Sequence, residues 1–112
     1  MKIAFTTPGP DMAAPMDPRF GRAASFLIFD TGSNDFVLID NTNIAAAHGA
    51  GLKAAEAIVK AGATVLITGE CGPKALSILQ KAGVKVFSAQ SMSVSDALKD
   101  FQAGRLGEIT GA

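Results

Sequence analysis

The residues of this sequence whose types and spacing suit chemistry fall into three short segments. These are Arg19-Phe20-Gly21-Arg22, His48-Gly49-Ala50-Gly51 and Gly69-Glu70-Cys71-Gly72-Pro73. The second and third segments precede predicted helices, and the first N–H groups of a helix lack partners and carry about half a positive charge. Glycines would also let a bulky ligand approach the backbone. Together the three segments predict a binding site for an anion.

Four cationic side chains are candidates to strengthen that site. Arg19 and Arg22 would add fixed positive charge, while Lys53 and Lys74 fall in the first turns of the two predicted helices, where a cation opposes the helix dipole. A bound anion would offset that cost, whereas each lysine could instead point into water and each arginine could pair with a nearby aspartate. The cofactor-binding candidates are therefore Arg19, Phe20, Gly21, Arg22, Gly49, Gly51, Lys53, Gly69, Gly72 and Lys74.

Soft donor atoms form a second group of candidates, as direct metal ligands. Cys71, the single cysteine, precedes a predicted helix, which should favour its thiolate form. His48, the single histidine, lies beside a helix start that should favour the neutral, ligand-competent imidazole. Met12 and Met16 could offer thioether sulfur to a soft metal. Ordinary alternatives remain for each: a small buried cysteine, a surface histidine, and methionines that fill gaps in the core.

Length and composition describe the kind of protein that carries these residues. With 112 residues, 48% of them apolar, the chain is predicted to form a single domain over residues 1–112 with a core of its own. Ten basic and ten acidic residues give a net charge of +0, which argues against nucleic-acid binding. A single cysteine excludes an intrachain disulfide, and no stretch approaches the ~20 apolar residues of a membrane span. We therefore expect a soluble, cytoplasmic protein.

The hydrophobic pattern predicts strands and helices that alternate in the second half of the chain. Strands are expected over residues 2–7, 25–30, 36–40, 64–68 and 84–87, and helices over 51–61, from Pro73 to the glycine at 83, and from Ser93 onward. The near-continuous apolar character of the second and third strands predicts that both sheet faces are covered. Residues 105–112 are expected to fray.

These elements predict an α/β fold of ribonuclease H-like topology. Right-handed crossovers give a five-stranded mixed sheet of order 3-2-1-4-5, with strand 2 antiparallel and helices on both faces. Ligands of such sheets bind beyond the carboxyl ends of the parallel strands, here after Thr7, Thr68 and Phe87. The three segments should meet there, together with a loop over residues 8–17 whose three prolines are typical of a functional or mobile loop.

Two enzymatic interpretations fit the residues less well. A ribonuclease H-type nuclease needs clustered carboxylates for two metals, and the first predicted strand has none. Residues 49–54 match the dinucleotide pattern G-x-G-x-x-A, and Glu70 follows at about the spacing of a ribose-binding acid. However, residues 41–48 separate this glycine turn from the preceding strand, and the chain is too short for a second mononucleotide-binding half.

Four segments of the sequence resemble one known family. They are Met1-Lys2-Ile3-Ala4-Phe5, Asp17-Pro18-Arg19-Phe20-Gly21-Arg22-Ala23 with Phe26, Gly49-Ala50-Gly51, and Thr68-Gly69-Glu70-Cys71-Gly72-Pro73-Lys74-Ala75. The chain resembles the dinitrogenase iron–molybdenum cofactor biosynthesis family, which includes NifX-type carriers and the C-terminal domain of NifB-type proteins. The resemblance covers nearly the whole chain. It implies a ribonuclease H-like fold and a non-catalytic role in binding or carrying a metal–sulfur cluster.

One position of the sequence differs from the nitrogenase cofactor carriers of this family. They often have a histidine before the Phe-Gly pair, where this sequence has Arg19. A guanidinium is a poor metal ligand, but it suits a polyanionic thiometallate that is held by charge and hydrogen bonds. The departure favours the branch of the family that holds a molybdenum–copper sulfide cluster.

The resulting hypothesis is a carrier, not an enzyme, for an anionic molybdenum–sulfur cluster. The cluster would contain copper or, as an alternative, be a precursor of the iron–molybdenum cofactor. The implied partners are the cluster and an acceptor protein or ATPase, with neither nucleic acid nor membrane among them. Two competing hypotheses remain: a small enzyme or sensor that binds a nucleotide or phosphorylated metabolite at the same helix starts, and an interaction module whose crevice stays empty.

Overall fold

The structure is a computed structural model that describes residues 1–41 and 50–110. This part of the chain forms six strands and three helices. Along the chain they are β1 (Lys2–Thr7), β2 (Ser25–Asp30), β3 (Asp35–Asp40), α1 (Ala50–Lys60), β4 (Val65–Thr68), α2 (Pro73–Lys81), β5 (Lys85–Ser88), α3 (Val94–Gln102) and β6 (Gly107–Glu108). The predicted order of elements is confirmed as far as α3.

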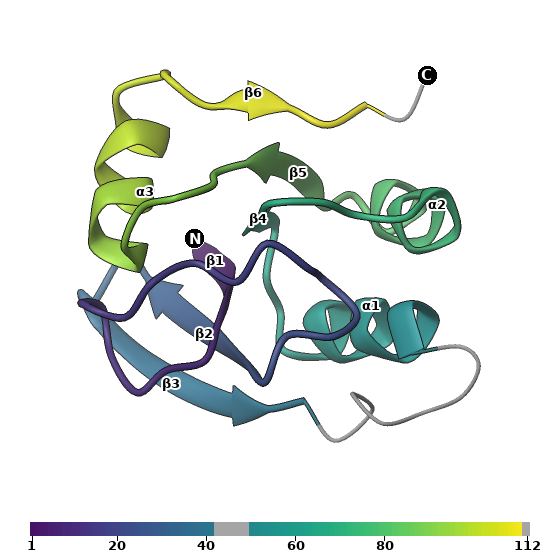
Figure 1. The fold of residues 1–112 in the computed structure, drawn as a ribbon. Coiled ribbons are helices and arrows are strands. Elements are labelled where there is room, and N and C mark those ends of the chain that lie inside the picture. Colours follow the sequence, from purple (N-terminus) through teal and green to yellow (C-terminus); the bar gives the residue numbers. More distant parts are fainter. Residues whose placement is uncertain (42–49, 111–112) are drawn as a thin grey trace.

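The six strands form one mixed sheet in the order β3-β2-β1-β4-β5-β6 (Figure 1). β2 is antiparallel to both β1 and β3, whereas β1 is parallel to β4 and β4 to β5. The predicted order of the first five strands, with strand 2 antiparallel, is therefore confirmed. The more specific expectation of a ribonuclease H-like topology stays a prediction.

The sixth strand corrects the prediction that the residues after 104 fray. β6 pairs antiparallel with β5, and the N–H group of Ile109 donates to the carbonyl oxygen of Val86 at 2.7 Å. The side chain of Gln80 donates to the carbonyl oxygen of Thr110 at 3.0 Å, and Ile109 packs against the core. A two-residue strand is too short to leave a hydrophobic period in the sequence, so pattern analysis could not find it.

Helices cover both faces of the sheet, as predicted. α1 and α2 pack on one face, where Ile58 and Leu79 join a buried cluster. α3 packs on the other face, where Val94 and Leu98 join a second buried cluster. Figure 1 shows α3 on the opposite side of the sheet from α1 and α2. The central strands are apolar along their length because alternate residues enter these two clusters.

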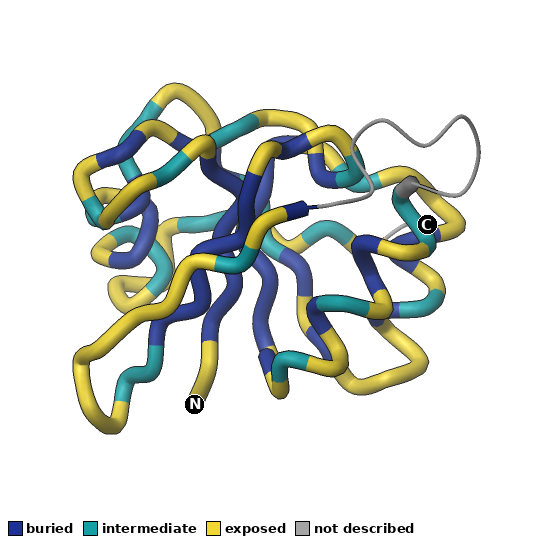
Figure 2. Tube along the Cα trace, turned by 90° about the horizontal axis from the view of Figure 1, so that it is seen from below, coloured by how far each residue is buried: buried dark blue, intermediate teal, exposed yellow. Residues whose placement is uncertain are grey.

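β3 is an exception to the predicted coverage of both sheet faces. Phe36, Val37 and Leu38 are exposed, although the neighbouring strand β2 is almost entirely buried. Figure 2 shows β3 as a mostly exposed strand beside the buried centre of the sheet. β3 lies at the edge, beyond the helices that cover the central strands. The predicted strand order already placed β3 at this edge, so the error lay in inferring from its apolar residues alone that both of its faces are covered.

The residues that begin and end the helices behave as their types predict. Pro73 is the first residue of α2, with Gly72 at the N-cap. Gly83, at φ +84°, follows the end of α2 and adopts a backbone conformation that only glycine takes easily. The hydroxyl of Ser93 caps α3 by accepting from the N–H group of Asp96 at 3.1 Å.

None of the helices in the described ranges is long and apolar enough to cross a membrane.

Candidate functional site

A cavity of about 630 Å³ opens where β1 and β4 end and α1 and α2 begin. We call it the α1–α2 pocket. Its lining consists of Arg19, Phe20, Gly21, Gly51, Leu52, Glu70, Gly72, Pro73, Lys74 and Ala75. The first and third of the sequence segments that were predicted to converge at the carboxyl ends of the strands therefore meet in one cavity, together with Gly51 from the second segment. The lining mixes apolar side chains and glycines with three charged side chains.

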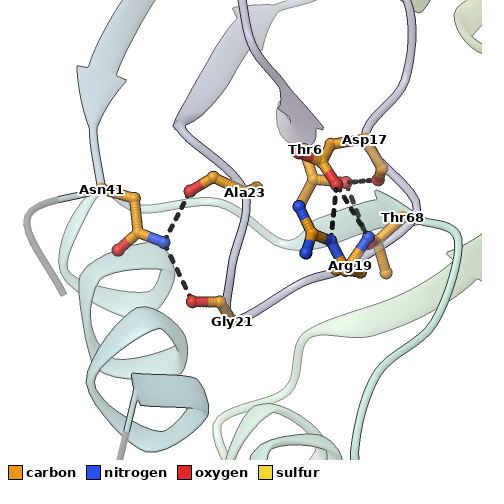
Figure 3. A network of polar contacts seen from close by, with 7 residues as sticks. All are labelled: Thr6, Asp17, Arg19, Gly21, Ala23, Asn41 and Thr68. Carbon is orange, nitrogen blue, oxygen red and sulfur yellow. Dashed lines mark hydrogen bonds and ion pairs between the residues drawn. The ribbon is translucent and has the colours of Figure 1, made fainter. Parts of the chain in front are cut away.

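The loop that follows β1 is fastened to the strand ends rather than left free. The hydroxyl of Thr6 donates to the carbonyl oxygen of Asp17 at 2.7 Å and lies 2.9 Å from the hydroxyl of Thr68. In return, the N–H group of Asp17 donates to the carbonyl oxygen of Thr6 at 2.8 Å. The hydroxyl of Thr7 donates to the carbonyl oxygen of Pro15 at 2.8 Å. Buried threonine side chains therefore hold the wall that carries Arg19 (Figure 3).

The same loop is joined to the turn after β4 by two backbone hydrogen bonds. The N–H group of Glu70 donates to the carbonyl oxygen of Pro18 at 2.7 Å, and that of Phe20 donates to the carbonyl oxygen of Glu70 at 3.2 Å. This close approach requires Gly69, because a Cβ there would lie 2.6 Å from the Cα of Pro18. Gly69 was expected to admit a ligand; the structure shows that it admits the loop.

The first turns of α1 and α2 lie against each other at the pocket. A Cβ on Gly51 would lie 3.6 Å from the Cβ of Ala75, which is an ordinary contact distance. No side chain caps α2, and Pro73 has no N–H group to satisfy. The N–H groups of Lys74 and Ala75 find no hydrogen-bond acceptor within residues 1–41 and 50–110. These two donors and the positive end of the α2 dipole are thus available to an anion in the pocket.

The lining of the α1–α2 pocket carries one acidic side chain as well as two basic ones. Arg19 is exposed, and its Nε lies 3.8 Å from Oδ1 of Asp17, which also accepts from the Arg19 N–H group at 3.0 Å. The predicted alternative, that an arginine of this segment pairs with a nearby aspartate, therefore holds for Arg19 and Asp17. Lys74 is exposed at the first turn of α2. Glu70 adds a carboxylate that was not among the site candidates, although its place between Gly69 and Cys71 in the predicted turn pointed to it.

Several predicted site residues lie elsewhere or outside the described residues. Lys53 lines a separate groove between α1 and α2, beside Glu56 and Lys60. Arg22 is exposed and follows the lining residue Gly21, but it does not itself line the α1–α2 pocket. His48 and Gly49 lie outside the described residues. Among residues 1–41 and 50–110, the predicted cations that line the pocket are therefore Arg19 and Lys74.

The sulfur atoms of Cys71 and of the two loop methionines pack against different core clusters. Burial raises the pKa of the Cys71 thiol to about 11, which reverses the prediction that the helix start favours the thiolate. Cys71 packs against the core cluster under α1 and α2. Met16 is buried in the cluster under α3, with Met12 packed against it. Among the described residues, no group of three or more histidine, cysteine, aspartate or glutamate side chains could hold a metal ion.

The fold agrees with what comparison with known proteins finds. The family model for dinitrogenase iron-molybdenum cofactor proteins matches residues 1–104. The chain belongs to this family, and the resemblance inferred from the sequence is confirmed. Family membership indicates a protein that binds or carries a metal cluster.

The chain is also similar to particular known proteins. The apo form of the orange protein from Desulfovibrio gigas is 40% identical, with a TM-score of 0.95 and coverage of 98% of this chain and 93% of that one. A NifB-like protein from Thermotoga is 38% identical, with a TM-score of 0.86 and coverage of 97% and 93%. An uncharacterized protein of Methanocaldococcus jannaschii is 31% identical over 94 residues, which are 81% of this chain and 80% of that protein.

Proposed function

We propose that the protein is a non-catalytic carrier that binds an anionic molybdenum–sulfur cluster in the α1–α2 pocket. The cluster is its cargo, with copper as a second metal or, as an alternative, in the form of an iron–molybdenum cofactor precursor. The observation that carries the proposal is the uncapped first turn of α2, which opens into the same cavity as Arg19 and Lys74. Family membership and the similarity to the orange protein support a metal cluster as the ligand.

The donor set of the pocket favours an anion that presents several acceptor atoms. Two backbone N–H groups and one ammonium from the first turn of α2, and one guanidinium from Arg19, supply the donors. Sulfide atoms of a thiometallate are soft acceptors of hydrogen bonds, and the apolar side chains of Leu52 and Pro73 suit their polarizable surface. Glu70 would oppose a ligand of very high negative charge, so it should limit the charge that the pocket accepts.

Direct ligation by cysteine is the less favoured mode of binding. A thiol with a pKa of about 11 is protonated at neutral pH, and only the thiolate ligates metals well. A metal that displaced this proton could still bind the Cys71 sulfur, and His48, Met12 and Met16 stay candidate ligands. We therefore propose that charge and backbone N–H groups hold the cluster and that Cys71 contributes at most a secondary contact.

The wider interpretation follows from the carrier role. Residues 1–112 would act as a single cluster-binding domain of ribonuclease H-like topology in the cytoplasm. A carrier must release its cargo, so an acceptor protein or an ATPase is the expected partner, and neither nucleic acid nor a membrane is needed. Gly21, Gly51 and Gly72 would keep the cavity open to the cluster.

The decisive experiment mixes the protein with tetrathiomolybdate and copper(I) without air and records visible absorption. We expect a protein-dependent band that saturates with added metal. Lys74→Ala and Arg19→Ala should each weaken loading about two- to fivefold, because an exposed charge contributes ~0.5–1 kcal/mol. Lys81→Ala, at the other end of α2, is the matched control and should load normally. Added salt should weaken loading of the unmodified protein.

Two outcomes would redirect the proposal. Loss of the band in Cys71→Ser, with Lys74→Ala unaffected, would show that thiolate ligation rather than charge holds the cluster. Absence of any protein-dependent band, together with saturable binding of ATP that Lys74→Ala weakens, would instead favour the small enzyme or sensor that binds phosphates at the same helix starts.

A further inference from the structure

β3 is an open edge of the sheet. It pairs with β2 over all six of its residues in an unbroken antiparallel register, and no other strand in the described ranges pairs with its outer side. The opposite edge, β6, is only two residues long. An edge strand presents unpaired N–H and C=O groups, and proteins usually protect such an edge with lysine, proline or a bulge. β3 contains neither residue, and its register shows no bulge.

The exposed side chains of β3 are unusually apolar for a surface. Phe36 is 38% exposed, Val37 60% and Leu38 39%. They are three of the five large apolar residues that the structure describes as exposed, and they are consecutive. Figure 2 shows this strand on the outside of the sheet. A contiguous apolar edge of this kind is typical of a surface that binds another protein.

A groove runs beside this edge on the face that α1 covers. It has a volume of about 360 Å³, and its apolar floor comes from Ile28, Val37, Ile39 and Ala61. Val37 and Ile39 lie two residues apart and therefore on the same side of β3. A strand added outside β3 would direct every second side chain over this groove. Backbone hydrogen bonds would supply affinity, and the groove would select apolar residues at alternate positions.

Acidic residues bound this surface at both ends of β3. Asp35 lies directly opposite Asp30 in the β2–β3 register, so two carboxylates face the same side of the sheet. Asp40 ends the strand at the other end and faces the opposite side of the sheet from Asp35. Lys2 lies opposite Asp30 in the β1–β2 register and offsets one of the three charges. The remaining negative charge is complementary to a basic residue at each end of an added strand.

We propose that the outer edge of β3 binds an extended segment of a partner protein as a seventh strand. That segment has apolar residues at alternate positions, flanked on both sides by lysine or arginine. The surface is separate from the α1–α2 pocket, so the proposal does not depend on the cargo. A carrier that docks its partner through β3 would leave the mouth of the pocket free during docking.

A second copy of this chain is a poorer occupant of the same edge. Successive side chains of a strand face opposite sides of the sheet, so Asp35 and Asp40 of two copies paired antiparallel through this edge could not lie opposite each other. Val37 could instead lie opposite Val37, which would place Asp35 of each copy opposite Ile39 of the other. Such a pairing offers no basic residue to Asp35 or Asp40, whereas a segment with basic flanks would pair with both.

The test selects ligands for the immobilised full chain from a phage-displayed library of random peptides. We expect enriched peptides with alternating apolar residues between basic ones. Their affinity, measured in solution with synthetic peptides, should fall at least about tenfold in Val37→Lys, which places a cation on the edge. Val59→Lys, an exposed valine on α1, is the matched control and should bind normally. Circular dichroism would verify that both variants are folded.

The charge component has its own measurement. The double variant Asp35→Asn, Asp40→Asn should bind the same peptides about tenfold more weakly, since it removes one charge pair at each end. The proposal is overturned if no peptide is enriched over the Val37→Lys protein, if enriched peptides lack basic flanks, or if the double variant binds equally well. Sedimentation that reveals a dimer dispersed by Val37→Lys would overturn it in favour of a second copy.

Discussion

Replacing Gly69 by alanine tests whether the pocket wall depends on close backbone contact. The new Cβ would lie 2.6 Å from the Cα of Pro18 and 2.7 Å from its carbonyl oxygen. Both neighbours are backbone atoms, so the loop must move away. Overpacking of this kind costs about 1–3 kcal/mol. Displacement would also strain the hydrogen bonds that join Glu70 to Pro18 and Phe20, each worth about 1 kcal/mol net.

We therefore expect Gly69→Ala to lower the free energy of unfolding by about 2–4 kcal/mol in urea denaturation. Gly107→Ala is the matched control, because a Cβ there meets nothing within 4 Å, and it should change stability by less than about 0.5 kcal/mol. If the two variants were equally stable, the loop would not rest on the β4 turn as described. Weaker cluster loading by a Gly69→Ala protein that remains folded would further connect this contact to the pocket.

Three further predictions concern Cys71, Asn41 and Ser93. Because burial raises the pKa of Cys71 from near 9 to about 11, its protonated form stabilises the fold, and that contribution should be lost as pH rises from about 9 to 11. Stability measured against pH should fall less in Cys71→Ser, and rapid alkylation of the folded protein at pH 7 would contradict the raised pKa. The Asn41 side chain is buried and donates to the carbonyl oxygens of Ala23 and Gly21 at 2.8 and 3.2 Å (Figure 3). Asn41→Ala should therefore cost about 1–3 kcal/mol in urea denaturation, and a loss below ~0.5 kcal/mol would refute the role of these bonds. Ser93→Ala removes the cap of α3 and should cost about 1 kcal/mol in thermal unfolding, against no measurable loss in the control Ser95→Ala.

The central part of the fold was predictable because local signals and topology agree. Apolar runs bounded by glycine and proline marked β1, β2, β4 and β5, while Pro73 and Ser93 marked the starts of two helices. The handedness of crossovers then left few ways to order the strands. β6 could not be predicted because two residues leave no hydrophobic period in the sequence. The exposure of β3 was missed because its apolar run indicated covered faces, although the predicted strand order already placed it at the edge.

The candidate site was predictable at the level of segments but not of side chains. The carboxyl ends of parallel strands converge in any such sheet, which brought Arg19, Gly51 and Lys74 to one cavity. Lys53 was misplaced because a first-turn residue can point away from the helix start. Cys71 was misjudged because its burial depends on tertiary packing, and desolvation outweighs the helix dipole. Both cases depend on tertiary packing, which the local sequence does not record.

The hydrogen bonds between the loop over residues 15–20 and the strand ends have a kinetic consequence. Asp17, Phe20 and Glu70 use their amide hydrogens in these bonds, so the hydrogens should exchange with deuterated solvent as slowly as those of the central strands. This wall of the pocket would then open only when the sheet itself opens. A ligand should consequently enter and leave through the existing mouth of the pocket, without movement of this wall. The rates of binding and release should then change only modestly with temperature.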